Sequence, residues 1–250
     1  MITYYQTDPG KVRSHNEDSV NIVKNLSGEY LFVVADGMGG HKAGEVASSL
    51  VVNELSKRFS ELSSVGSKEE AVVWLKEIIE EINVKILRYA EEHIDASGLG
   101  TTCVCSILTD NFLLFGNIGD SSGFVFKRGK LYKVTKDHTL VNILLESGEI
   151  TESDAKTHPQ KNVLMKALGA AEVIDIDIFE VIMNEESDKI DGIFLCSDGL
   201  TNMLTTEQIE KVLNDEDLEI SERISKLIMK ANMRGGNDNI TIAYGAIGGE

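Results

Sequence analysis

Residues 101–134 read TTCVCSILTDNFLLFGNIGDSSGFVFKRGKLYKV and contain four short apolar runs separated by turn-forming residues. The runs span 101–108, 112–117, 123–126 and 131–134, and each has the length and bounding residues of a β-strand. Neighbouring parallel strands need a crossover of about a dozen residues or more, and no interval in this stretch is that long. The stretch therefore predicts antiparallel strands in meanders rather than β-α-β units.

The flanking sequence adds helices and further strands. The clearest helix is predicted over 68–92, where Ser67 and Glu70 form a capping box and apolar residues recur at three- and four-residue steps. Other helices are expected at 43–59, 206–213 and 221–232, with short ones between 137 and 168 and Thr151 as a cap. Other strands are expected at 30–35, 173–179, 193–196 and 240–244. No stretch resembles a linker, so the pattern predicts a single domain over residues 1–250: an α+β fold, a four-layer α-β-β-α sandwich of two antiparallel β-sheets flanked by helices.

Composition and charge exclude several classes of protein. The 24 Lys and Arg residues against 41 Asp and Glu give a net charge of −17, which repels the phosphates of nucleic acids. No apolar run approaches the ~20 residues that span a bilayer, and the start lacks a secretory signal, so we expect no membrane insertion and a cytoplasmic location. Cys103 and Cys105 share one face of a predicted strand and Cys196 is the third cysteine. An odd number of cysteines with this spacing favours reduced thiols that pack in the core over a framework of disulfides.

Acidic residues stand where apolar runs end. Asp36 and Asp198 each follow such a run and precede a glycine, and other acids beside such runs or near the N-terminus are Asp120, Asp238 and the pair Glu17 and Asp18. Carboxylates next to buried strands are costly when unpaired, and Lys and Arg are scarce in these segments. Any one Asp-Gly step is most simply a turn, so spacing alone leaves a set of turns and a shared metal site as alternatives. Carboxylates supply oxygen ligands, and no His or Cys residues show the spacing of a zinc site. A metal bound by these acids is therefore expected to be magnesium or manganese.

A glycine-rich segment, GMGGHKA at 37–43, leads into a predicted helix. Such a segment can cradle an anion at the helix start. It fits neither GxxxxGK[ST] nor GxGxxG, so a nucleotide P-loop is a weak match and is set aside. Glycine also lets a backbone carbonyl approach a metal ion without an intervening side chain.

Seven motifs in a fixed order carry a family resemblance. They are RSHNED (13–18), DGMGGHKAGEVAS (36–48), GLGTT (98–102), GNIGDS (116–121), DHTLV (137–141), CSDGL (196–200) and GGNDNIT (235–241). The sequence resembles the metal-dependent type 2C (PPM) protein serine/threonine phosphatases in their compact bacterial form. The motifs cover residues 13–241, and the paired antiparallel sheets of that family agree with the predicted pattern.

The resemblance implies which residues bind metal. Asp36 matches the carboxylate that bridges two ions, with the carbonyl of Gly37 on one of them. Asp198 and Asp238 match the acids that complete the second ion. The implied cofactors are two Mn²⁺ or Mg²⁺ ions.

Further acids extend this implied ligand set. Asp18 matches an acid that binds directly or through ordered water, and its neighbour Glu17 is a further candidate. Bacterial relatives can hold a third, weaker ion between the positions that match Asp120 and Asp198. Asp120 is equally consistent with a loop-fixing role.

For the reaction, the resemblance implies hydrolysis of phosphoserine and phosphothreonine in proteins by a metal-bridged hydroxide, without a covalent phosphoenzyme. Two cations that share a water lower its pKa. Arg13 matches the arginine that grips the substrate phosphate with its planar fork. His41 matches the histidine of the glycine loop and is the candidate proton donor to the leaving alkoxide, and capping or packing at the helix start is its alternative role.

Other residues near the motifs are expected to support the site. Cys196 is expected in the core, and His138 is expected to steady a loop. Arginine is frequent in relatives at the positions of Ser122 and Lys166. These two departures predict altered support of the site or altered contact with the substrate, rather than loss of catalysis. Residues 142–162 correspond to the flap beside the site, and their sequence does not reveal which phosphoproteins are accepted.

Two hypotheses from different classes remain. An active phosphatase would reverse a serine/threonine kinase, and its partners would be phosphorylated proteins, including that kinase and its substrates. A pseudophosphatase would use the same fold only to bind phosphoproteins, and it should lack an acid at position 36, 198 or 238. All three acids are present, which favours the active enzyme. A monomer is expected because no assembly motif is evident.

Overall fold

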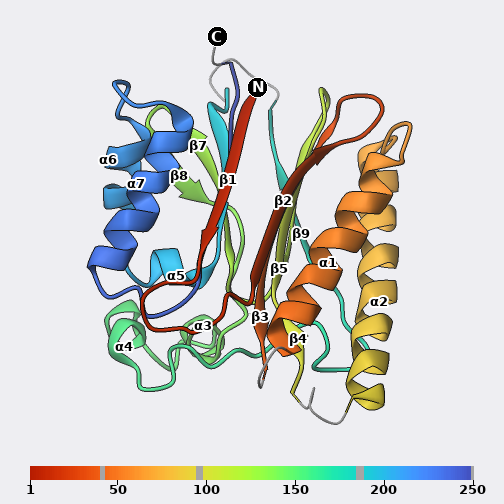
Figure 1. The fold of residues 1–250 in the computed structure, drawn as a ribbon, viewed down its shortest axis with the longest axis horizontal. Coiled ribbons are helices and arrows are strands. Elements are labelled where there is room, and N and C mark those ends of the chain that lie inside the picture. The colour runs from red at the N-terminus through yellow and green to blue at the C-terminus, as the bar shows by residue number, and fades with distance from the viewer. Residues whose placement is uncertain (40–42, 94–97, 184–188, 249–250) are drawn as a thin grey trace.

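The structure, a computed structural model, describes residues 1–39, 43–93, 98–183 and 189–248. Two antiparallel β-sheets lie face to face, with helices on the outer side of each (Figure 1). One sheet has the strand order β1-β11-β10-β7-β8 and the other β2-β3-β5-β6-β9, with β4 paired to β3. The strands are β1 Ile2–Asp8, β2 Asp18–Lys24, β3 Tyr30–Met38, β4 Gly100–Thr101, β5 Cys103–Leu108, β6 Leu113–Ile118, β7 Ser122–Lys127, β8 Lys130–Lys133, β9 Asp177–Val181, β10 Gly192–Cys196 and β11 Ile240–Ala246.

The helices form the two outer layers. Two of them, α1 and α2, cover the sheet that contains β2 and β3, and α6 and α7 cover the sheet that contains β1 and β11. The short helices α3, α4 and α5 lie at one end of the sandwich (Figure 1). The bounds are α1 Ala43–Ser60, α2 Lys68–Glu92, α3 Leu140–Glu146, α4 Glu152–Thr157, α5 Asp198–Thr201, α6 Thr206–Leu213 and α7 Ile220–Met233. Within the described residues, no helix has the length and apolar composition needed to cross a membrane.

Three apolar cores hold these layers together. Alternate residues of each strand point to opposite faces, so Val33 of β3 packs under α1 and α2 while Phe32 and Val34 pack between the two sheets. Cys103 and Cys105 point toward the helices and are buried as free thiols, as the sequence predicts. The four layers confirm the predicted α+β sandwich.

Local sequence signals account for the clearest helices. The helix predicted over 68–92 has those bounds, and Ser67 and Glu70 form the expected capping box. Thr151 caps α4 by accepting a hydrogen bond from the backbone N–H of Asp154. The N-terminal ends of α2 and α4 are set by short-range contacts, because each cap residue bonds to a group three residues further along the chain.

The structure also differs from the sequence-based prediction. The strands of 101–134 form two hairpins, β5–β6 and β7–β8, which belong to different sheets because the chain crosses between the sheets around Gly119. Gly119 has φ +105°, a conformation that side chains with a Cβ rarely adopt. The strand predicted at 173–179 begins only at Asp177, and Val173 is 88% exposed, so no burial holds it against the sheet. The strands β1 and β2 and the helix α5 were not predicted.

Candidate metal centre

Carboxylates from five separate segments meet at one end of the sandwich. Asp18 begins β2 and lies directly opposite Asp36 near the end of β3. Asp120 lies in the turn between β6 and β7, Asp198 begins α5, and Asp238 precedes β11. Like charges directly opposite each other destabilise a strand pair, so the pairing of Asp18 with Asp36 indicates a site that needs positive charge.

The raised pKa values of four of these carboxylates also indicate that the site needs positive charge. Burial raises the pKa of Asp36 well above its ordinary value, and the neighbouring carboxylates of Asp18, Asp198, Asp120 and Asp238 raise it further. Burial likewise raises the pKa of Asp18 to about 7 and that of Asp120 to about 7. Burial, followed by the charge of Asp238, raises the pKa of Asp198. A divalent cation bound among these groups would stabilise their ionised forms.

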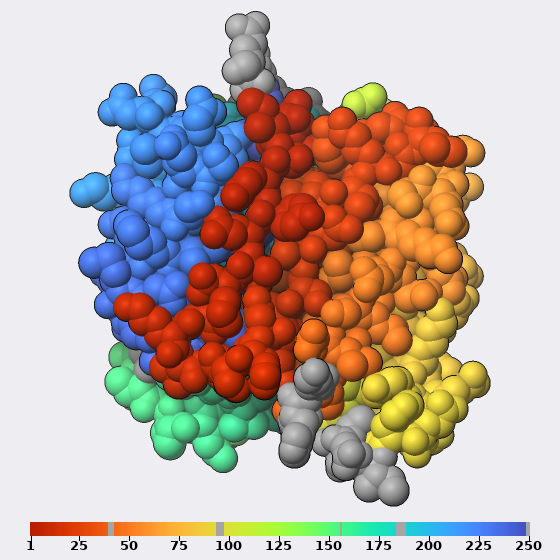
Figure 2. Space-filling model, in the orientation of Figure 1, coloured from red at the N-terminus to blue at the C-terminus, as the bar shows by residue number. Residues whose placement is uncertain are grey.

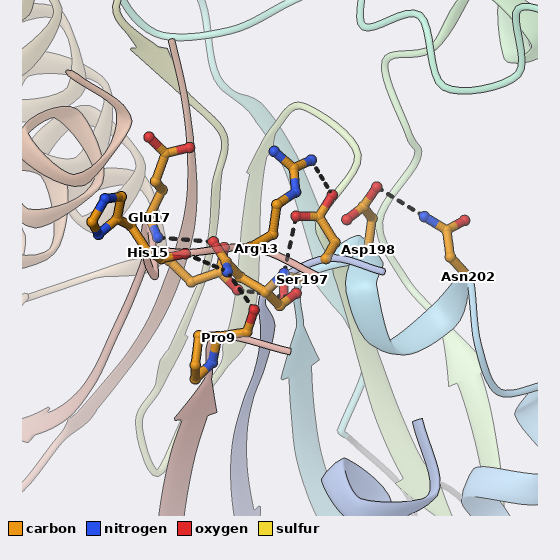
Figure 3. A network of polar contacts seen from close by, with 10 residues as sticks. Pro9, Arg13, His15, Glu17, Ser197, Asp198 and Asn202 are labelled. Carbon is orange, nitrogen blue, oxygen red and sulfur yellow. Dashed lines mark hydrogen bonds and ion pairs between the residues drawn. The ribbon is translucent and has the colours of Figure 1, made fainter. Parts of the chain in front are cut away.

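Two oxygens of the cluster lack partners in the described part of the chain. Ser197 Oγ donates to Asp18 Oδ2 at 2.7 Å. Asn202 Nδ2 donates to Asp198 Oδ2 at 2.9 Å (Figure 3). The second oxygens, Asp18 Oδ1 and Asp198 Oδ1, are buried without any hydrogen-bond partner. Buried polar atoms are normally satisfied, so these two oxygens are candidates for metal ligands. Their hard carboxylate chemistry fits Mg²⁺ or Mn²⁺.

Arg13 forms an ion pair with Asp238, one of the predicted metal ligands. Its Nη2 donates to Asp238 Oδ2 at 2.8 Å across the mouth of the site (Figure 3). No three His, Cys, Asp or Glu side chains of the described residues are arranged as a ready-formed cage for one ion. The donor chemistry and the orphaned oxygens nevertheless fit a divalent cation.

Backbone contacts fix the end of β3 where the carbonyl of Gly37 was predicted to bind an ion. Gly37 N donates to the carbonyl of Glu17 at 3.1 Å, and Thr102 N donates to the carbonyl of Asp36 at 2.9 Å. A Cβ on Gly37 would lie 2.1 Å from the carbonyl oxygen of Gly44 in α1. The helix therefore packs directly on the backbone of β3, and no other residue fits at position 37 without displacing it.

Two uncharged residues that the sequence did not single out position the cluster. Ser197 is fully buried, donates to Asp18 and accepts a hydrogen bond from Thr241 N at 3.0 Å. Asn239 accepts from Glu17 N and donates to the carbonyls of Pro9 and His15 (Figure 3). Their only sequence signal was their place inside the motifs CSDGL and GGNDNIT.

The turn that carries Asp120 is held by His138. Its Nδ1 accepts from Gly119 N at 2.9 Å, and its own backbone N donates to Gly119 O at 2.9 Å. On the other side of the ring, Nε2 lies 3.1 Å from Asp177 Oδ2, and Lys166 Nζ lies 2.6 Å from Asp177 Oδ1. This geometry agrees with the loop-steadying role expected for His138 and gives Lys166 a supporting contact.

The other residues singled out in the sequence lie outside the described residues, in the core or in the predicted flap. His41, the predicted proton donor, lies outside the described residues. Cys196 is fully buried, as predicted, and burial raises the pKa of its thiol, which makes it a poor nucleophile. Ser122 is also buried, so this departure from the family affects packing rather than contact with a substrate. The predicted flap, 142–162, includes part of α3 and the whole of α4.

The metal-free protein is expected to lose stability as the pH rises through the cluster's titration. Asp18 has an ordinary pKa of 3.8 and a folded-state pKa of about 7, so between these values the folded state binds the proton more tightly than the unfolded state. The free energy of unfolding therefore falls as the pH rises through this range. The full contribution of the protonated Asp18 to stability is present only below its ordinary pKa. Relative to Asp18→Asn, the wild-type melting temperature in EDTA should fall by at least about 2–4 °C between pH 5.5 and 8. Parallel pH profiles for the two proteins would contradict the assignment.

The two-sheet sandwich with carboxylates gathered at one end agrees with the fold and the acidic cluster that the family resemblance implies. The family model described as Protein phosphatase 2C matches residues 10–233, and the chain belongs to this family. This confirms the family, the fold and the enzyme class predicted from the sequence.

Individual relatives agree with this assignment. The serine/threonine phosphatase stp of Listeria monocytogenes is 41% identical over 242 residues, which cover 97% of this chain and 94% of that protein. The structure of serine/threonine phosphatase Stp1 from Staphylococcus aureus matches with a TM-score of 0.90 and 36% identity, covering 99% of this chain and 95% of that one. The catalytic domain of PstP in complex with two manganese ions matches with a TM-score of 0.81 and 31% identity, covering 97% and 96%. None of these relatives supports the pseudophosphatase alternative.

Proposed function

We propose that residues 1–250 form one catalytic domain that hydrolyses phosphoserine and phosphothreonine in proteins, with two divalent cations held by the carboxylate cluster. The observation that carries this proposal is the pair of buried, unpartnered oxygens, Asp18 Oδ1 and Asp198 Oδ1, on two carboxylates whose pKa values burial raises. The ions would be held by Asp36, the Gly37 carbonyl, Asp18, Asp198 and Asp238.

Each group of the chain then has a defined task. When bound, the two cations supply an activated water near neutral pH and positive charge for the phosphoryl oxygens. Arg13 is exposed at the mouth of the cluster, where its planar guanidinium can bind two phosphoryl oxygens at once. Ser197 and Asn239 hold Asp18 and the segment before it in place. His41 would donate the proton to the leaving serine or threonine oxygen.

The same proposal covers a third ion, the identity of the metal, the partners, the oligomeric state and the location. Asp120 and Asp198 would hold a third, weaker ion, and Mn²⁺ or Mg²⁺ would occupy the sites. Partners would be phosphorylated proteins, including a serine/threonine kinase and its substrates. The protein would act as a monomer in the cytoplasm.

The test is release of phosphate from a phosphothreonine peptide with and without Mn²⁺. We expect manganese-dependent release that is absent in EDTA and in Asp36→Asn, because loss of the bridging carboxylate removes the charge that both ions share. Calorimetric titration with Mn²⁺ separates binding from turnover. Folded wild-type protein that binds Mn²⁺ and releases no phosphate would contradict the proposed function.

A further inference from the structure

The outward face of α7 carries an apolar and basic surface that the proposed catalytic roles do not use. Met229 and Met233 are 53% and 73% exposed and lie four residues apart, so they form one ridge on the helix. Three grooves of about 560, 320 and 530 Å³ open along this ridge, and Met229 lines all of them. The α7 surface consists of Lys11, Lys226, Met229, Lys230, Met233 and Arg234.

This surface is basic in a chain whose net charge is −17. Among the described residues, neither Lys11 nor Lys230 pairs with a carboxylate. Arg234 donates to the Met203 carbonyl and to the side chain of Gln208, which are both neutral. These cations are therefore available to an acidic partner, and an acidic molecule would meet repulsion over most of the rest of the protein.

The acids beside the grooves offset part of this charge and lie mainly away from Lys230 and Arg234. Lys226 forms an ion pair with Asp215 at 2.7 Å, which leaves the other three cations of the surface. Asp8 accepts hydrogen bonds from Asn232 and from a backbone N–H, and Glu222 accepts from the backbone N–H at the start of α7. Both carboxylates keep their charge beside two of the grooves, whereas the groove of Lys226, Lys230 and Arg234 has no carboxylate among the described residues that line it.

The α7 surface continues into the catalytic end of the molecule. The backbone N–H groups of Lys11 and Val12 both donate to the carbonyl of Gly236, just beyond the end of α7, at 2.8 and 3.3 Å. Arg13 follows directly and pairs with Asp238 in the carboxylate cluster. In Figure 2 the blue surface of the α7 region lies beside the red surface of the N-terminal segment. A polypeptide bound at Arg13 can therefore extend over Lys11 onto α7.

We propose that the α7 surface docks an acidic, apolar segment of the phosphoprotein substrate while the phosphorylated residue lies at Arg13, an inference that rests on the proposed function. Methionine side chains adapt to differently shaped apolar groups, so Met229 and Met233 suit a site that accepts several sequences. The cations supply complementarity to Asp and Glu of the segment. The docking segment is therefore separate in sequence from the phosphorylated residue and joined to it by the stretch that passes over Lys11.

The test compares two phosphothreonine peptides that share a core sequence, one of them extended by a segment of Asp, Glu and Leu. We expect kcat/KM with Mn²⁺ to be about tenfold higher for the extended peptide, from one apolar anchor and screened charge pairs. Lys230→Glu and Met229→Asp should each remove most of this advantage by raising KM at unchanged kcat. Hydrolysis of p-nitrophenyl phosphate should stay the same.

Matched variants separate docking from general effects. Lys57→Glu in α1 makes the same charge change on an exposed helix position, and Val84→Asp in α2 replaces a side chain that is 51% exposed. Neither should alter the ratio between the two peptides. Equal kcat/KM for both peptides in the wild type, or equal losses in the matched variants, would overturn the proposal.

Binding measured without turnover separates this inference from the proposed function. Fluorescence anisotropy of the labelled extended peptide in EDTA should report binding that Lys230→Glu weakens. If this result holds and no peptide is hydrolysed with Mn²⁺, docking stands and the phosphatase proposal fails. If sedimentation instead reveals a dimer that Met229→Asp dissociates, the surface binds a second copy of the chain and the docking proposal fails.

Discussion

Replacing Asp198 by asparagine is expected to lower manganese-dependent turnover by more than about 100-fold. Loss of groups that only support a metal ligand typically costs about 10–100-fold in affinity or activity, and Asp198 is proposed to bind the ion directly. The substitution removes one negative charge from the cluster and leaves the side chain the same size. The remaining carboxylates then hold the cations more weakly.

The fold should survive this change. Burial and the charge of Asp238 raise the pKa of Asp198, so the neutral amide relieves repulsion in the metal-free protein. The amide oxygen can still accept the hydrogen bond that Asn202 Nδ2 donates. The melting temperature in EDTA should therefore be equal to or above that of the wild type.

Thermal shift with Mn²⁺ provides the second readout. Wild-type protein should gain stability when Mn²⁺ is added, because a ligand that binds only the folded state stabilises it, and Asp198→Asn should lose most of this gain. Asp110→Asn is the control, since Asp110 is an exposed aspartate in the turn between β5 and β6. Normal turnover and a normal Mn²⁺ shift in Asp198→Asn would refute the ligand assignment.

Helices and the presence of the carboxylate cluster could be predicted because their signals are local. The capping box of α2 involves residues only three positions apart, and the apolar period runs through one helix. The acids at positions 36 and 198 stand out as charges that interrupt apolar runs. Because burying unpaired charge is costly, these positions raise a shared cation as an alternative to simple turns, and the family resemblance decides between the two.

The parts that were missed depend on contacts between distant segments. The strand β1 pairs with β11, so Ile2 lies opposite Ala246, and its half-exposed residues give no continuous apolar run. Asn239 binds Glu17 N from 222 positions away, and an uncharged side chain gives no sign of such a partner. The turn at Gly119 reads like a hairpin, because nothing local states that the next strand joins another sheet.

Replacing Arg13 by alanine is expected to raise KM for a phosphothreonine peptide by about 10- to 100-fold with little change in kcat. A hydrogen bond to a charged group contributes about 1.5–3 kcal/mol, and the net loss of one such bond to the phosphoryl group corresponds to about this factor. Arg13→Lys keeps the charge without the planar fork, so its KM should lie between those of wild type and Arg13→Ala.

The ion pair with Asp238 gives the same variant an opposite effect on metal binding. Arg13 and Asp238 are 52% and 35% exposed, and ion pairs that exposed contribute only about 0–1 kcal/mol. Removing Arg13 frees Asp238 for the ion, so Mn²⁺ should bind up to about fivefold more tightly by calorimetry. Weaker substrate binding together with equal or tighter metal binding distinguishes a phosphate-binding arginine from one that merely supports the site. An unchanged KM would show that another group binds the phosphate, and weaker Mn²⁺ binding would show that Arg13 helps to build the metal centre rather than competing for it.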